Sequence, residues 1–229
     1  MHMPVFDKLI YWRDTTVRKA AENMAVDQVM MSRVGNDPIL RIYDWSEPSV
    51  SFGYFHALED ARLAFPSSKE SPVDYVRRWT GGGIVDHRID LTYTLVVPRQ
   101  CGLSHERGAL SYRIIHQVLA GVLNVLGQNV ELSDHDDGDG SICFNNPVTF
   151  DLADTHGVKI AGAGQRRTRH GLLHQGSLLT DLDADLIGQE FACQLASKQE
   201  AWLACESFEE EVLAIAADRY ATAEWLGKK

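Results

Sequence analysis

The amino-acid sequence predicts a mixed-sheet α/β, or α+β, fold. The chain has 229 residues, of which 45% are hydrophobic and 24% charged, as in ordinary globular domains. A chain of this length buries roughly 70% of its unfolded surface, so it needs no disulfide or metal for stability. Its periodic segments run in the order helix, strands, helix, strands, helices, without regular βαβ alternation. The length alone fits one large domain or two small ones. Neither an internal repeat nor a Pro/Gly/Ser linker divides the chain, which favours one domain over residues 1–229.

The first expected helix covers residues 14–34. Its apolar residues follow helical spacing, namely Val17, Ala20, Ala21, Met24 and Met31. Gly35 is a plausible stop for this helix. Asp27 falls on the same stripe, where a carboxylate is either a satisfied core polar group or part of a site. Because buried acids usually have partners for packing reasons, the sequence favours the first reading.

The remaining elements follow from alternation, helical spacing and turn residues. The clearest strand covers 90–97, where Leu91, Tyr93 and Leu95 alternate with other residues. A long helix with one apolar face is expected over 107–126, ended by Gly127. The other expected strands are 38–45, 49–54, 73–79, 147–153, 157–163 and 171–179, and the tail helices are 183–204 and 207–226.

Charge and cysteine content narrow the function. The net charge of −10, from 22 basic and 32 acidic residues, argues against a nucleic-acid binder, which needs a basic face. No two of the four cysteines have C-x-x-C spacing; they are Cys101, Cys143, Cys193 and Cys205. Few cysteines, no apolar run of about 18 residues and no leader segment predict a cytoplasmic protein without a membrane partner.

We expect no metal site. The acidic loop at 132–141 lacks the calcium-loop pattern, because Gly138 and Asp139 stand where a ligand and the turn glycine are required. His170 and His174 are four residues apart, but their segment is predicted as turn and strand rather than helix. A mobile solvated loop is the better reading of 132–141.

A glycine-rich segment offers the first candidate site. Arg77 and Arg78 are followed by Trp79, Thr80 and the glycines 81–83, with His87 nearby. Consecutive glycines let the backbone approach a ligand closely, and their N–H groups can cradle an anion. The pattern is neither a Walker loop nor G-x-G-x-x-G. Taken alone, the segment is either a flexible hairpin turn or a ligand-binding loop.

The second and third candidates are Lys159 and Cys143. If Val158 and Ile160 face the core, period-two alternation places Lys159 on the opposite face, where its ammonium could neutralise a phosphate or an oxyanion. An isolated strand lysine is usually a surface residue, but Arg166, Arg167 and Arg169 follow it closely. Cys143 is either a buried small hydrophobe or a nucleophile with a lowered pKa. His87, His170 and His174 are candidate acid–base groups.

Taken together, these segments resemble the lipoate–protein ligase and octanoyltransferase family, within the biotin/lipoate transferase group. The most specific match is Arg77-Arg78-x-Thr80-Gly81-Gly82-Gly83-x-Val85-x-His87. The resemblance covers nearly the whole chain, in order. Its other segments are Asn23-Met24-Ala25 with Asp27, Arg41-Ile42-Tyr43 with Trp45, Ser51-Phe52-Gly53-Tyr54-Phe55, Asp90-Leu91-Thr92-Tyr93-Thr94, Lys159-Ile160-Ala161-Gly162 with Gln165, His174-Gln175-Gly176-Ser177-Leu178, and Tyr220-Ala221-x-x-Glu224-Trp225.

The resemblance implies a mixed β-sheet flanked by helices, similar to the catalytic domain of class II tRNA synthetases and biotin ligases, and a tunnel for a medium-chain acyl group. It implies Cys143 and Lys159 as catalytic residues. It implies a substrate-binding set made of Arg77, Arg78, Thr80, Gly81, Gly82, Gly83, His87, Gly162, Gln165, His174 and Gly176.

Within the family, the Cys-Phe-x-x-Pro motif at 143–147 resembles the cysteine-dependent octanoyltransferases. The resemblance then implies octanoyl transfer from octanoyl acyl carrier protein to the lysine of a lipoyl domain, such as the glycine-cleavage H protein or a 2-oxoacid dehydrogenase E2. A Cys143 thioester intermediate requires no cofactor, because the incoming thioester is already activated. The length leaves no residues for the extra C-terminal domain that a ligase usually needs.

Two alternatives stay open. The first is the catalytic subunit of an ATP-dependent lipoate–protein ligase, with ATP, Mg and lipoate and a separate accessory domain. The second is a non-catalytic acyl-binding relative, suggested by Ala163-Gly164, which departs from the family pattern. Both implied protein partners are commonly acidic. We therefore expect a locally basic docking face that contains Arg77, Arg78, Arg166, Arg167 and Arg169.

Overall fold

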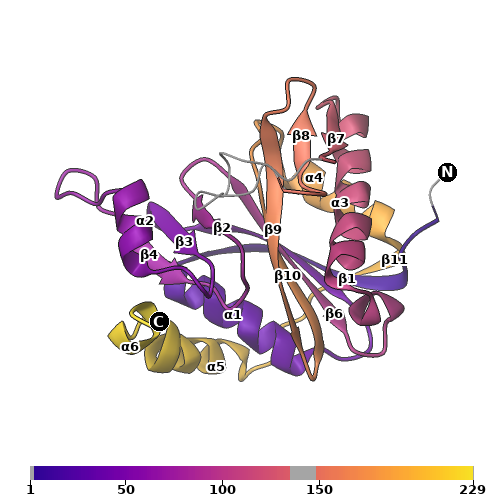
Figure 1. Cartoon of the computed structure of the whole chain (residues 1–229). Helices are drawn as coiled ribbons and strands as arrows, with labels where there is room; N and C mark the ends of the chain where they lie inside the picture. Colours follow the sequence, from indigo (N-terminus) through magenta and orange to yellow (C-terminus); the bar gives the residue numbers. More distant parts are fainter. Residues whose placement is uncertain (1–2, 135–147, 229) are drawn as a thin grey trace.

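The computed structural model describes residues 3–134 and 148–228. An eight-stranded mixed sheet forms its central layer, with helices on both faces and a smaller three-stranded sheet beside it (Figure 1). The predicted mixed sheet flanked by helices is confirmed. Within these residues, no helix combines the length and apolar character needed to span a membrane.

The elements follow one another in a mixed order. They are β1 (Phe6–Arg18), α1 (Ala20–Arg33), β2 (Ile39–Trp45), β3 (Ser49–Phe52), α2 (Leu58–Ala64), β4 (Asp74–Arg77), β5 (Ile84–Asp86), β6 (Leu91–Pro98), η1 (Gly102–His105), α3 (Gly108–Val125), β7 (Val130–Leu132), β8 (Leu152–Asp154), β9 (Lys159–Thr168), β10 (Gly171–Leu178), α4 (Ala184–Leu195), β11 (Ala196–Ala201), α5 (Phe208–Ile215), η2 (Ala216–Tyr220) and α6 (Ala223–Leu226).

The large sheet has the order β11-β1-β2-β6-β10-β9-β8-β7. β1 pairs in parallel with both β11 and β2, and the pairs from β2 onward are antiparallel. The small sheet has the order β4-β3-β5, with β3 parallel to β4 and antiparallel to β5. The long central strands β6 and β10 are buried along their whole length, which is typical of a sheet covered on both faces.

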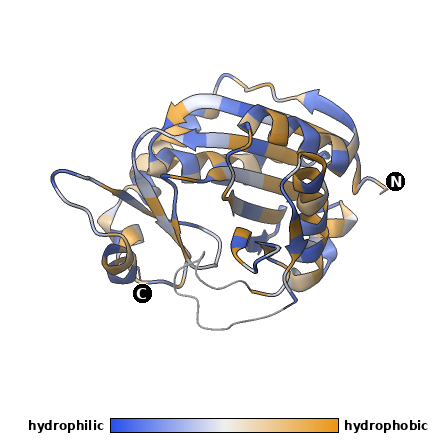
Figure 2. Ribbon diagram, turned by 90° about the horizontal axis from the view of Figure 1, so that it is seen from above, coloured by the Kyte–Doolittle hydropathy of each residue, from blue (hydrophilic) through white to orange (hydrophobic). Residues whose placement is uncertain are grey.

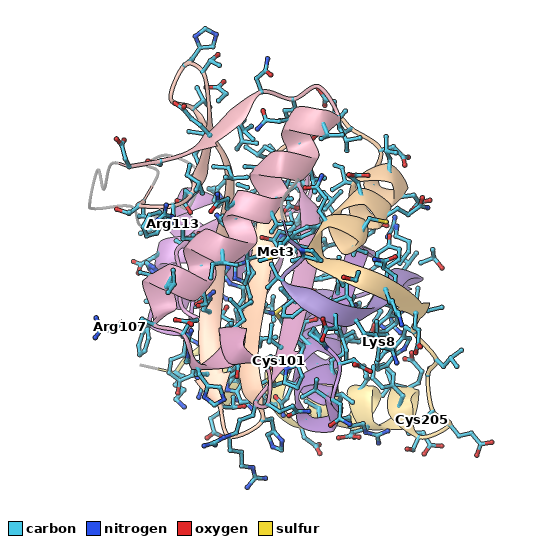
Figure 3. The ribbon with its side chains drawn as sticks, turned by 90° about the vertical axis from the view of Figure 1, so that its right-hand side faces the viewer. Met3, Lys8, Cys101, Arg107, Arg113 and Cys205 are labelled. Carbon is cyan, nitrogen blue, oxygen red and sulfur yellow. The ribbon has the colours of Figure 1, made fainter. Side chains whose placement is uncertain are left out.

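Alternating side chains of the central strands feed two separate cores. On one face, Leu95, Val97 and Leu172 pack with α3 and α4. On the other face, Val96 and Leu173 pack with α1, α5 and η2. Viewed from above, apolar segments recur along the strands and along the helices that cover them (Figure 2). Figure 3 shows α3 lying across one face of the sheet, with Arg107 and Arg113 along one side of this helix.

A third, small core lies between the three-stranded sheet and α2, around Val50, Phe52 and Ile84. Arg77, at the end of β4, ties this unit to the C-terminal segment. Its fully buried guanidinium donates to five backbone carbonyl oxygens at 2.6–2.9 Å. The acceptors are Tyr54, His56, Trp225, Leu226 and Lys228. Arg77 is therefore a link between the small sheet and α6.

The prediction of a helix over 14–34 is wrong in its first turn. Residues up to Arg18 belong to β1, and Val17 is 68% exposed rather than on a buried stripe. Lys19 is extended (φ −68°, ψ 162°), and α1 begins at Ala20. Val17 lies three residues before Ala20, so it matched the helical spacing by position alone. Pairing of Asp14 and Arg18 with β2 decides the conformation of this segment.

The predicted tail helix over 183–204 is also wrong beyond Leu195. The polar segment from Ala196 to Ala201 is strand β11, which pairs in parallel with β1 at the sheet edge. Its sequence has no strand signature, so tertiary pairing overrides local preference. The sequence also missed strand β5 after the glycine segment. The helix predicted over 207–226 is divided into α5, η2 and α6. The other predicted elements are confirmed, with ends displaced by up to five residues, as at the start of β8 and the end of β9.

Replacing Arg77 tests the link between the small sheet and the C-terminal segment. Arg77→Lys removes the planar fork that satisfies five carbonyl groups, so several of them lose their donor. We expect a loss of about 3 kcal/mol in the free energy of unfolding, measured by urea denaturation. Arg88→Lys is the control, because Arg88 is more exposed and pairs with Asp86 alone; its effect should stay below about 1 kcal/mol. Equal effects of the two changes would contradict the link.

Candidate active site

A narrow pocket lies where the small sheet meets strands β6, β9 and β10. It encloses about 330 Å³, part of which is open to solvent. The lining mixes apolar side chains with glycines and hydrogen-bonding groups. The lining residues are Met24, Tyr43, Trp45, Ser51, Arg78, Val85, His87, Thr92, Gly162, Ala163, Gly164, Gln175, Gly176 and Ser177.

Close backbone contacts between the glycine segment and its neighbours form one wall of this pocket. A Cβ on Gly164 would lie 2.4 Å from the Gly81 carbonyl oxygen, and a Cβ on Gly53 would lie 1.9 Å from that of Gly82. Gly82 also has φ +91°, a conformation that favours glycine. The glycine segment is therefore a close-packed wall held against β9, rather than the flexible hairpin turn of the alternative reading.

Side-chain hydrogen bonds of Arg78 and His87 hold this wall in place. Arg78 donates to the Gly83 carbonyl at 2.7 Å, to the Gly81 carbonyl at 3.2 Å and to the Ser51 hydroxyl at 2.7 Å. His87 Nε2 lies 2.6 Å from the same hydroxyl, and His87 Nδ1 lies 2.9 Å from Asp90 Oδ2. The indole of Trp45 stacks on the His87 ring at 4.0 Å. This side of the pocket is a connected polar wall with an aromatic surface.

Asp27 supports the pocket through hydrogen bonds that its buried carboxylate accepts. Arg41 and Thr94 donate to its carboxylate at 2.9 and 2.8 Å. Burial raises the pKa of Asp27, and the charge of Arg41 opposes that shift. Gln175, a pocket residue, donates to Asp27 at 2.6 Å and accepts from the Thr80 hydroxyl at 2.7 Å. Asp27 is thus a satisfied core group, as favoured from the sequence, and it also fixes Gln175 and Thr80.

Lys159 lies buried over Gly162. Its Nζ is 2.6 Å from Asp151 Oδ2, and a Cβ on Gly162 would lie 2.8 Å from that Nζ. The Tyr112 hydroxyl donates to Asp151 Oδ1 at 2.5 Å and accepts from the Ala163 N–H at 2.8 Å. The absence of a side chain at Gly162 leaves the space that the ammonium group occupies, at one edge of the pocket.

A β-bulge explains this position of Lys159. Leu152 pairs with Ala161 and Ala153 pairs with Lys159, so β9 has one extra residue at Ile160. A bulge reverses the alternation of side chains beyond it, which allows Lys159 to turn toward Gly162. The condition set for this alternation holds for Ile160, which packs against the core, but not for Val158, which is 55% exposed while Lys159 is buried.

Two buried histidines lie behind the pocket. Burial lowers the pKa of His116 to about 4, and burial together with the charge of His116 lowers that of His174. His116 donates from Nδ1 to the Phe150 carbonyl at 2.7 Å. His174 lies 3.0 Å from the Tyr93 hydroxyl and 3.0 Å from the Gln165 amide. Both rings are therefore neutral near pH 7.

The structure brings most of the predicted site residues together. Arg78, His87, Gly162 and Gly176 line the pocket, and Thr80, Gly81, Gly82 and Gly83 contact lining residues. Gln165 and His174 lie behind it, beside α3. Cys143 lies outside the described residues. Among those residues, no group of three acidic, histidine or cysteine side chains is arranged to hold a metal ion.

The predicted docking face is wrong for Arg77 and Arg78. Both are buried, and both direct their donors to backbone carbonyls. Neither guanidinium can therefore meet a docked protein. Arg167 and Arg169 are exposed on β9 and in the following turn, whereas Arg166 is half-buried against Trp79.

Sequence reasoning missed the groups that hold Lys159. Asp151 and Tyr112 have no signal in the sequence beyond their places in the expected strand 147–153 and the expected helix 107–126. Gln175 and Trp45 belonged to the family segments, yet neither had been given a role. Contacts across the sheet could not be inferred from spacing along the chain.

The mixed sheet flanked by helices, with a glycine-walled pocket at its centre, is the catalytic domain of a known enzyme family. The chain belongs to the lipoyl protein ligase A/B catalytic domain family, whose model matches residues 19–217. It is 33% identical over 189 residues to octanoyltransferase LipM of Symbiobacterium thermophilum, covering 77% of this chain and 68% of that protein. It is 33% identical over 175 residues to octanoyltransferase LipM of Staphylococcus aureus, covering 71% and 63%.

Two solved structures share the fold. A structure of lipoate-protein ligase A bound with ATP superposes with a TM-score of 0.75 at 20% identity, covering 96% of this chain and 98% of that one. A bipartite lipoate protein ligase from Thermoplasma acidophilum, studied with its E2 lipoyl domain, gives 0.69 at 18% identity, covering 100% and 99%. At this level of identity the likeness concerns the architecture.

Breaking the Lys159–Asp151 pair should destabilise the fold. Asp151→Asn leaves a buried ammonium without its carboxylate, which costs about 3–5 kcal/mol in the free energy of unfolding. The control is Asp86→Asn, whose ion pair with Arg88 is more exposed and should contribute less than about 1 kcal/mol. Urea denaturation of the three proteins measures both losses. A loss below 1 kcal/mol in Asp151→Asn would show that the pair does not stabilise this region.

Burial of His116 should make stability depend on pH. Its folded pKa of about 4 lies below the unfolded value of about 6.5. The unfolded state therefore binds the proton first, and stability present above pH 6.5 is lost as pH falls toward 4, by up to about 3 kcal/mol. Unfolding of the wild type should show this slope, and His116→Gln should reduce it. The exposed His156→Gln change is the control. Parallel curves for the wild type and His116→Gln would contradict the assignment.

Proposed function

We propose that this protein transfers an octanoyl group from octanoyl acyl carrier protein to the lysine of a lipoyl domain, through a thioester on Cys143. The observation that carries this proposal is the buried Lys159–Asp151 pair over Gly162, at the edge of a narrow pocket. Two relatives at 33% identity are octanoyltransferases. The matched part spans 63–68% of their length.

The proposed chemistry consists of two acyl transfers. The Cys143 thiolate attacks the thioester carbonyl carbon, a tetrahedral oxyanion forms, and its collapse expels the carrier thiolate, which takes up a proton. The neutral amine of the acceptor lysine then attacks the octanoyl-enzyme. It forms the amide, loses a proton and returns the Cys143 thiolate. Both steps exchange one acyl bond for another, so neither requires ATP or a metal.

Lys159 is the proposed source of positive charge. Its ammonium lies at the pocket edge, where it stabilises the thiolate and the developing oxyanion. The Asp151 carboxylate accepts from Lys159, from the Tyr112 hydroxyl and from the Val148 N–H, which fixes the ammonium in one place. A preorganised charge stabilises a transition state without reorganisation during the reaction. Asp151 and Tyr112 are positioning residues in this scheme.

The pocket suits a thin, unbranched acyl chain. Met24, Tyr43, Val85 and the ring of Trp45 supply apolar contact along its lining. Gly162 and Gly164 keep its β9 side free of side chains. We propose that the octanoyl chain lies along the pocket lining, with the glycine wall on one side and its carbonyl at Lys159. The implied acceptors are lipoyl domains such as the glycine-cleavage H protein or a 2-oxoacid dehydrogenase E2.

Intact mass measurement tests nucleophile, donor and ATP independence together. Wild-type protein incubated with octanoyl acyl carrier protein, without ATP, should gain the mass of one octanoyl group. Cys143→Ser should gain none, and transfer to a lipoyl domain should fall by at least about 100-fold. Cys101→Ser and Cys205→Ser are controls, because these cysteines are free thiols in the structure. Full turnover of Cys143→Ser would refute the thioester mechanism.

The same assay separates the alternatives. Modification of a lipoyl domain that requires ATP and free lipoate, and that persists without Cys143, would identify a lipoate–protein ligase catalytic subunit. Acyl binding without transfer to any lipoyl domain would identify a non-catalytic relative.

A further inference from the structure

Three cations lie around one half-buried tyrosine, Tyr54, beside the pocket. The Arg166 guanidinium lies 5.4 Å from the Tyr54 ring and 4.8 Å from the Trp79 ring. Arg219 lies 3.9 Å from the Trp225 ring and 5.2 Å from the Trp79 ring. Lys228 lies 4.9 Å from the Tyr54 ring and 5.3 Å from the Trp225 ring. We call these three cations, with Tyr54, Phe55, Trp79 and Trp225, the cationic aromatic surface.

These cations have no carboxylate partner within the described part of the chain. Elsewhere the acidic protein pairs its arginines: Arg13, for example, contacts both Asp44 and Asp185. Arg166 and Arg219 instead donate to the Trp79 carbonyl and the Gln28 amide oxygen. The buried Nε of Arg166 has no hydrogen-bond acceptor among the described residues. The surface therefore carries positive charge that the described residues do not neutralise.

The charges converge on the Tyr54 hydroxyl. Its pKa is lowered, first by the hydrogen bond from Lys228 and further by the charges of Lys228, Arg166 and Arg219. A field that favours the phenolate favours any other anion placed at the same point. The same three cations that surround the ring therefore favour negative charge at this point.

Exposed aromatic and apolar side chains adjoin the charges. Phe55 is 89% exposed, and its ring packs edge-on against Tyr54 at 5.1 Å. Leu63 of α2, a neighbouring helix, is also exposed. Tyr, Trp and Arg are the residues enriched at the centres of protein–protein interfaces. An apolar anchor surrounded by cations is complementary to an acidic protein that has an apolar centre.

This surface adjoins the outer side of the pocket wall. Arg166 donates to the Trp79 carbonyl at 3.1 Å, and the Tyr54 N–H donates to the Thr80 carbonyl at 2.8 Å. Arg77 holds the carbonyls of Tyr54, Trp225 and Lys228 together. The segment that closes the pocket therefore contacts the cationic aromatic surface through Trp79 and Thr80.

We infer that the cationic aromatic surface docks the acidic carrier protein that delivers the acyl group. This inference rests on the proposed function, since it assigns the donor of that reaction to a place on the molecule. The cationic aromatic surface differs from the docking face expected from the sequence. Of the five arginines named there, it includes Arg166 alone.

Distance favours the donor over the acceptor. Gly162 lies beside the Lys159 ammonium, and Arg166 follows Gly162 by four positions on β9. Along an extended strand this step corresponds to about 13 Å. A carrier protein holds its acyl group on a long prosthetic arm, which can span this separation. The acceptor lysine has only four methylene groups, so its protein must dock closer to Lys159.

The test compares two donors in transfer assays. The double change Phe55→Ser with Lys228→Glu alters two exposed side chains. The ratio of KM for octanoyl acyl carrier protein to KM for octanoyl-pantetheine, which lacks the protein, should rise about 10-fold. The matched control is Lys198→Glu, an exposed cation on β11 at the far edge of the sheet, which should leave the ratio unchanged. An unchanged ratio in the double variant would overturn the inference, as would a rise in KM for the lipoyl domain alone.

Carrier binding is measured separately by calorimetry on proteins that carry Cys143→Ser. Acyl carrier protein should bind about 10-fold more weakly when Phe55→Ser and Lys228→Glu are added, and increasing salt should weaken its binding to the parent protein. This readout does not require turnover, so failure of the proposed transfer and failure of the docking surface are distinguishable. Equal binding to the two proteins would overturn the inference.

Discussion

The close approach of the glycine segment to β9 is the constraint on which the site depends. Gly164 faces Gly81, and Gly53 faces Gly82, at separations that admit no side chain. The backbones of the glycine segment and its neighbours gain dispersion energy at this short distance. They keep this distance because surrounding side chains hold the glycine segment in place. Arg78 fixes the segment through the Gly81 and Gly83 carbonyls, and Asp27 fixes Thr80 through Gln175. The pocket wall therefore depends on buried charges on two sides.

Buried cations organise this acidic protein. Arg41, Arg77, Arg78 and Lys159 are all buried, and each directs its donors to oxygen atoms. Two of them bind carboxylates, and the other two bind mainly backbone carbonyls. An arginine that satisfies several carbonyls joins segments far apart in sequence without a second charge to desolvate. This explains why a chain with a net charge of −10 keeps so many of its cations inside.

The sequence predicted what depends on local pattern and on family motifs. Alternation located β6 and β10, and the glycine motif located the pocket wall with Arg78 and His87. It could not predict β11, whose polar residues form a strand because β1 offers a free edge. Nor could it identify Asp151 and Tyr112 as partners, since their contact with Lys159 and Ala163 crosses the sheet. Arg77 was misassigned because the motif identifies the residue without showing where its side chain points.

β9 carries Lys159, two glycines of the pocket lining and Arg166 on one strand, and the bulge at Ile160 brings the Lys159 ammonium to the pocket edge. With strict alternation, Gly162, Gly164 and Arg166 share a face from which Lys159 is excluded. The extra residue reverses the face beyond Ile160, so the Lys159 ammonium can lie over Gly162. Removal of one residue at the bulge would carry Lys159 away from Asp151 while leaving Gly164 against Gly81. The register of this strand, rather than the identity of Lys159 alone, therefore determines whether the charge and the acyl pocket coincide.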